Sequence, residues 1–156
     1  MIQRVQSIYL LITTALTSLM LFLPFAEILT NQQIIYVFNH SGIFDSQIQG
    51  EDGYVLKTLS LSIIIAIIAI ISFVNIFLYK KRTLQIRLCN YNILLQIGIL
   101  ALLGFYFYKI FKQLENPTIH YSIALILPLI ASILIFLARK AIIHDEKLIR
   151  SVDRIR

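Results

Sequence analysis

Four long apolar stretches, nearly free of charged side chains, constrain the fold of this chain more than any other feature. Each can cross a hydrocarbon core of about 30 Å as a helix, which takes about 20 residues. Lipid offers no water to backbone N–H and C=O groups, so only helices and closed barrels cross it. The sequence therefore predicts an all-α membrane protein, a bundle of four transmembrane helices. We expect these helices at about residues 8–25, 55–79, 88–108 and 121–138.

The composition agrees with a membrane protein. Of the 156 residues, 58% are apolar and only 14% are charged, whereas about a quarter of the residues in a soluble domain are charged. The single cysteine, Cys89, cannot form an internal disulfide, so it does not indicate a redox compartment. Neither a repeat nor a linker divides the sequence, and we expect one integral-membrane domain over residues 1–156.

The first apolar stretch also resembles a signal peptide, because Arg4 precedes it. The stretch is longer than the 7–15 residues typical of the apolar region of a signal peptide, and no small-residue cleavage site follows it. We therefore expect a retained helix.

The distribution of basic residues predicts the orientation. Eleven of the fourteen Lys and Arg residues fall in the N-terminal segment, the connection between the second and third stretches, and the tail of residues 139–156. Only Lys57, Lys109 and Lys112 lie on the opposite side. The positive-inside rule then places both termini in the cytoplasm. The formal net charge of +6 follows from this topology, so the expected partner is the lipid bilayer and not nucleic acid.

The long connection of residues 26–54 is expected outside the membrane. Two β-prone runs flank His40-Ser41-Gly42 and predict a small β-hairpin that caps the bundle. Alternatively, this connection lies flat on the lipid headgroups through Tyr36 and Phe38.

The predicted spans hold no group suited to catalysis or to metal binding. Their interior carries no charged side chain, which is the usual mark of an ion or proton pathway. The three histidines fall in the predicted outer connections or in the tail, and one cysteine cannot form a redox disulfide. We therefore expect neither an enzyme nor a cofactor.

Neutral polar residues do occur within the spans. Asn75 lies near the end of the second stretch, and Asn92 and Gln96 share one face of the third because they are four residues apart. One interpretation is a polar vestibule, open to the cytoplasm, for a small solute or a lipid headgroup. The other is hydrogen bonding between helices, which contributes about 0.6 kcal/mol per bond.

Small residues recur at helical spacing and predict close helix packing, although the same faces could instead meet the helices of a partner. The third and fourth stretches show them most clearly, at Gly98, Ala101, Gly104, Ala124, Pro128, Ala131 and Ala138.

The tail of residues 139–156 is predicted to be a cytoplasmic helix with an apolar stripe. Glu146 and Arg150 form a favourable pair four residues apart. A mixture of acidic and basic side chains favours a solvated helix or a specific protein contact over a simple polybasic lipid tether. A plain topological anchor is the alternative. The candidate partner-binding residues are Arg4, Asp145, Glu146, Arg150, Asp153 and Arg154.

The two ends of the chain resemble those of a known family. "MIQRVQSIYLL" followed by "LFLP", together with the ending "ARKAIIHDEKLIRSVDRIR", is similar to the domain of unknown function 4293, a family of small four-helix membrane proteins from Bacteroidota. This resemblance covers essentially the whole chain. It implies a bacterial inner-membrane location and supplies no activity.

Both family-like segments fall on the predicted cytoplasmic face. If they meet there, Arg4 could pair with Asp145 or Glu146 and tie the first helix to the fourth. We expect a non-enzymatic accessory or scaffold protein that engages a membrane-protein partner through this face. The alternative is a transporter of small solutes or lipids that uses Asn75, Asn92 and Gln96.

Overall fold

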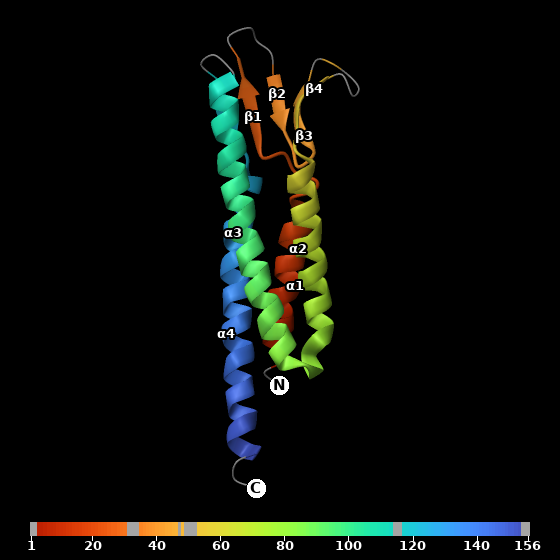
Figure 1. Cartoon of the computed structure of the whole chain (residues 1–156), viewed down its shortest axis with the longest axis vertical. Coiled ribbons are helices and arrows are strands. Elements are labelled where there is room, and N and C mark those ends of the chain that lie inside the picture. Colours follow the sequence, from red (N-terminus) through yellow and green to blue (C-terminus); the bar gives the residue numbers. More distant parts are fainter. Residues whose placement is uncertain (1–2, 31–34, 47, 49–52, 114–116, 154–156) are drawn as a thin grey trace.

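Four helices lie side by side, and a small sheet closes one end of the bundle (Figure 1). The computed structural model describes residues 3–30, 35–46, 48, 53–113 and 117–153. The main contacts join the helices in the cyclic order α1, α2, α3, α4. The helices are α1 Gln3–Leu19, α2 Leu59–Phe77, α3 Arg82–Gln113 and α4 Leu127–Asp153, and 3-10 turns at Leu78–Lys80 (η2) and Ile123–Leu125 (η3) precede α3 and α4.

The sheet overturns the prediction of an all-α fold. It has five antiparallel strands in the order β4-β3-β2-β1-β5. The predicted hairpin around His40 supplies only two of them, β2 and β3. Both connections contribute, because β5 lies between α3 and α4 and pairs with β1. The strands are β1 Ala26–Leu29, β2 Ile35–Phe38, β3 Gly42–Asp45, β4 Tyr54–Lys57 and β5 Thr118–Tyr121.

Two predicted helix boundaries are wrong, because the predicted helices include apolar residues of a strand and of a turn. The second stretch was expected to be helical from residue 55, but β4 occupies its start and α2 begins only at Leu59. The first helix ends at Leu19, because the chain turns towards β1, where the Phe25 N–H donates to the Phe38 carbonyl (2.7 Å). Hydrophobicity marks apolar residues, but it does not separate a buried strand from the helix that follows it.

The sheet packs on the far end of α3, which is longer than a membrane crossing requires. Its 32 residues span about 48 Å at 1.5 Å per residue, so α3 rises beside β1 in Figure 1. Phe38 of β2 lies at the centre of an aromatic cluster, with ring centroids 5.5 Å from Phe25, 6.1 Å from Tyr106 and 5.5 Å from Phe107. Edge-to-face contacts of this kind add to the burial of apolar area.

The turn between β2 and β3 is fastened to the start of α2. The carbonyl of His40 accepts hydrogen bonds from the hydroxyls of Thr58 (3.0 Å) and Ser62 (2.9 Å). The Thr58 N–H donates to the Ser41 carbonyl (2.9 Å). Thr58, the residue before α2, therefore connects the β2–β3 turn to the start of this helix.

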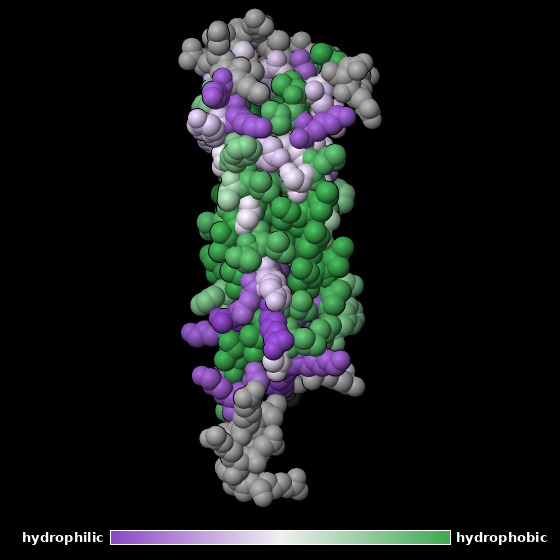
Figure 2. Space-filling view, viewed as in Figure 1, coloured by the Kyte–Doolittle hydropathy of each residue, from purple (hydrophilic) through white to green (hydrophobic). Residues whose placement is uncertain are grey.

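On the face shown in Figure 2, an apolar belt covers the helices between two more polar regions. Three helical segments are long and apolar enough to cross a membrane: Leu59–Phe77, Arg82–Lys112 and Ile123–Leu148. Only 28–33% of their most apolar windows is buried, so most of this surface faces outward. Exposed apolar surface on such a scale is typical of a protein that associates with a membrane. The fourth, α1, is apolar but shorter, over Val5–Leu19.

The small residues divide into two groups. Ala124, Ala131 and Ala138 are fully buried, as expected for close helix packing. On α3, by contrast, a Cβ added at Gly98 or Gly104 would have no atom within 4 Å. The α3 stripe therefore does not mediate packing within this bundle.

We predict that Gly42→Ala weakens the sheet. A Cβ at Gly42 would lie 2.5 Å from the Leu56 carbonyl oxygen and 2.8 Å from the Tyr54 ring, so strands β3 and β4 would have to separate. Overpacking of this kind costs about 1–3 kcal/mol of folding free energy. The measurement is thermal unfolding of the purified protein in detergent. Gly104→Ala is the matched control, with unchanged or slightly higher stability, and equal stability of the two variants would contradict the packing described here.

Candidate functional site

A row of polar side chains fills the interface between α2 and α3 at the end of the bundle where α1 begins and α4 ends. We call this row the polar seam and this end the terminal end. Every member is at most 4% exposed. The α3 members recur every three or four residues, which places them on one helix face. The polar seam comprises Ser72, Asn75, Gln85, Cys89, Asn92 and Gln96.

Hydrogen bonds within the polar seam join the two helices. The Gln85 side-chain amide donates to the Asn75 backbone carbonyl (2.9 Å), and the Asn75 amide donates to Cys89 Sγ (3.2 Å). Further along, the Asn92 amide donates to Ser72 Oγ (2.6 Å). Interhelical bonding, the structural alternative for Asn75 and Asn92, is therefore present.

Gln96 differs from the other members of the polar seam. Both of its amide atoms are buried, and neither has a hydrogen-bond partner within the described part of the chain. Asn75 Oδ1 and Asn92 Oδ1 are also buried without a partner in the described part of the chain, but the amide nitrogens of these two residues do donate. A buried polar group left without a partner costs about 1–3 kcal/mol, so this interior has acceptors and donors available for a small polar molecule such as water.

A second polar contact fastens α1 to α4. The Gln6 amide donates to the carboxylate Oδ2 of Asp145, and both residues are less than 10% exposed. The other carboxylate oxygen, Oδ1, is buried and has no partner among the described residues. Two candidate partner-binding residues therefore differ in exposure, because Asp145 is buried and Glu146 only partly so.

The structure does not describe the side chains of the remaining candidate partner-binding residues. These are Arg4, Arg150 and Asp153, and Arg154 lies outside the described residues altogether. The pairing of Arg4 with Asp145 or Glu146 stays a prediction. Sequence reasoning overlooked Gln6 as the partner of Asp145, although Gln6 belongs to the N-terminal segment that carries the family resemblance.

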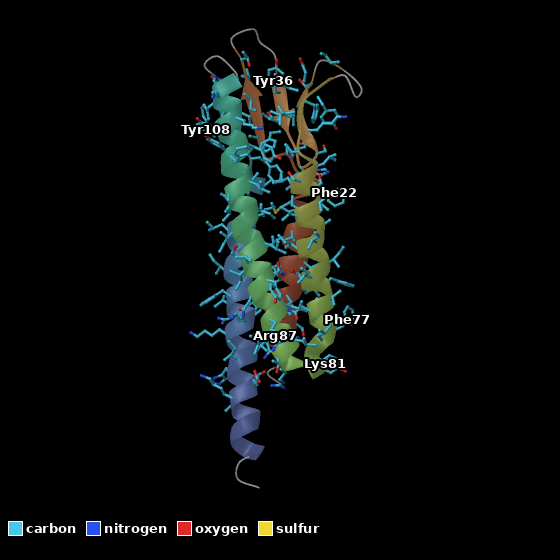
Figure 3. The ribbon with its side chains drawn as sticks, viewed as in Figure 1. Phe22, Tyr36, Phe77, Lys81, Arg87 and Tyr108 are labelled. Atoms are coloured by element: carbon cyan, nitrogen blue, oxygen red, sulfur yellow. The ribbon has the colours of Figure 1, made fainter. Side chains whose placement is uncertain are left out.

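A groove of about 450 Å³ lies beside this contact, between α1 and α4. Its walls combine apolar side chains of both helices with basic side chains of α4. Figure 3 labels two further basic residues of the terminal end, Lys81 in the α2–α3 connection and Arg87 of α3. In the described part of the chain, no three His, Cys, Asp or Glu side chains are grouped to hold a metal ion.

Comparison with known protein families identifies the chain over nearly its whole length. The family described as "Domain of unknown function (DUF4293)" matches residues 2–155. The chain belongs to the DUF4293 family. No curated protein and no solved structure matches it. The features of this DUF4293 protein that bear on its function are therefore the polar seam, the groove and the course of α4.

We predict that Cys89 is protected from thiol reagents in the folded protein, because its side chain is fully buried in the polar seam. Asn75→Ala should speed its labelling by N-ethylmaleimide, since it removes the donor to Sγ and a buried side chain. A loss of about 1.4 kcal/mol corresponds to a tenfold increase in the open population. Asn90→Ala, at an exposed position on the same helix, is the control. Equal labelling rates for both variants would show that Asn75 does not protect Cys89 from the reagent.

Proposed function

We propose that this DUF4293 protein is a non-enzymatic accessory or scaffold protein of a bacterial inner membrane. It crosses the bilayer four times, keeps both termini in the cytoplasm, and binds another membrane protein through the end of α4. The observation that carries the proposal is the unbroken continuation of α4 to Asp153, past the point where α1 begins (Figure 1).

The geometry of α1 supports a fourth crossing. Its 17 residues span about 26 Å, slightly less than a hydrocarbon core of about 30 Å. Apolar residues continue beyond the helix to Phe25, and Phe22 points outward with 82% of its surface exposed (Figure 3). The bias of basic residues towards the terminal end supports its cytoplasmic location.

The end of α4 is suited to a partner more than to lipid alone. Asp145 accepts a hydrogen bond from Gln6 of α1, and the eight residues from there to Asp153 extend α4 by about 12 Å. This segment combines acidic and basic residues with Leu148, which is 46% exposed. Charges of both signs beside an apolar side chain favour a specific protein contact.

We predict that a photo-crosslinking amino acid at Arg150 captures a single membrane protein in cells. The same probe at Lys81, an exposed basic residue of the α2–α3 connection at the same end, is the matched control and should not capture it. Removal of residues 149–156 leaves the Gln6–Asp145 contact intact and should release the partner during purification in mild detergent. Identical capture from both positions, or a complex that survives the truncation, would contradict this proposal.

A second candidate function, transport of a small polar solute, is favoured by one observation. Gln96 places an amide with two unpartnered atoms in the interior of the bundle, where a solute could satisfy them. Asn92 lies one helical turn away on the same face.

If the polar seam binds a solute, Gln96→Leu should abolish transport while the Arg150 crosslink persists. If the seam is only structural, the same substitution should raise the stability, because a well-packed apolar side chain costs less than an unpaired amide. Transport activity, measured together with thermal unfolding on this one variant, therefore distinguishes transport from a structural role. Asn90→Leu, at an exposed position on the same helix, serves as the amide control.

A further inference from the structure

The groove between α1 and α4 is lined by apolar side chains of both helices and by basic side chains of α4. Val5 and Tyr9, one turn apart on α1, face Leu137 of α4 across it. Val5 and Leu137 are 46% and 39% exposed, so these apolar side chains are accessible from outside the protein.

The basic wall comes from a single face of α4. Lys140, His144 and Lys147 follow one another at intervals of four and three residues, line the groove and are all exposed. Lysine ammonium groups bind phosphate as point charges, and histidine provides an N–H donor in either protonation state. These residues lie in the last turns of the apolar segment Ile123–Leu148. With this segment crossing the membrane as proposed above, on which this inference rests, they lie at the level of the lipid phosphates.

The groove also contains one acceptor. Asp145 lines it, is only 6% exposed, and accepts from Gln6 through Oδ2 alone. Its Oδ1 is itself buried and has no partner among the described residues, so the donor of a ligand reaches it only when the carboxylate rotates towards the groove. A carboxylate disfavours a ligand that is purely anionic, but it suits a headgroup that carries a donor close to its phosphate.

We propose that this groove binds one molecule of phosphatidylethanolamine from the surrounding leaflet. Its phosphate lies against Lys140, His144 and Lys147, its ammonium group donates to Asp145 Oδ1, and an acyl chain covers Val5, Tyr9 and Leu137. Phosphatidylcholine presents the same phosphate but no N–H donor, so the groove discriminates between the two lipids. The site is complete before residue 149, so it does not depend on the partner proposed above.

The test uses the full chain in nanodiscs of equimolar phosphatidylethanolamine and phosphatidylcholine, followed by native mass spectrometry of the lipid that stays bound. Wild type should retain phosphatidylethanolamine in about tenfold excess, equivalent to about 1.4 kcal/mol. The double variant Lys140→Gln/Lys147→Gln should lose both lipids. Lys81→Gln/Arg87→Gln removes the same charge from exposed positions at the same end and should retain wild-type binding.

Two further variants separate binding from folding. Asp145→Asn keeps an acceptor for Gln6 and should retain phospholipid while losing the preference for phosphatidylethanolamine. Ala141→Phe fills the groove without changing its charge and should exclude both lipids at an unchanged thermal midpoint.

Four outcomes would overturn the proposal. These are equal retention of the two lipids by wild type, wild-type retention by Lys140→Gln/Lys147→Gln, stronger retention of phosphatidylglycerol in a parallel nanodisc, and displacement of the bound lipid by millimolar inorganic phosphate. The last would identify a site for free phosphate. Removal of residues 149–156 should leave lipid retention unchanged, so failure of the partner proposal and failure of this one are distinguishable.

Discussion

In hydrocarbon, apolar side chains give helices no reason to associate, because lipid tails are as apolar as leucine. The bundle described here is arranged accordingly. Ile63, Ile67 and Ile70 of α2 face outward, whereas Ser72 and Asn75 of the same helix are fully buried. Hydrogen bonds between α2 and α3, and between Gln6 and Asp145, supply contacts that burial of isoleucine cannot supply.

The opposite end of the molecule is held together as a soluble domain is. Around Phe38, apolar and aromatic residues of the sheet pack against α3 and form a continuous buried cluster. A cap that lies outside a membrane is surrounded by water, so removal of apolar area from solvent stabilises it. The two ends therefore follow different physical rules within one short chain, and α3 takes part in both, through Asn92 at one end and Tyr106 at the other.

The sequence predicts the helices well, because long apolar runs have few alternatives. It also indicates that Asn92 and Gln96 are neighbours on one helix face, because they are four residues apart. It does not reveal β5, since four residues, Thr118–Tyr121, carry too short a pattern and their partner β1 lies far away in the chain. The Gln6–Asp145 contact is equally hidden, because it joins positions 139 residues apart and local periodicity says nothing about such pairs. Gly98 likewise gave no sign that it faces outward.

The position of β5 imposes an order of assembly. A chain made from its N-terminus produces β1 to β4 before α3 and α4, and β5 follows only after the whole of α3. Until then one edge of β1 has no neighbour, and an unpaired edge is open to other strands. Formation of the second helical pair, α3 and α4, therefore also completes the sheet. The newly made protein has its most vulnerable moment between the synthesis of β4 and the arrival of β5.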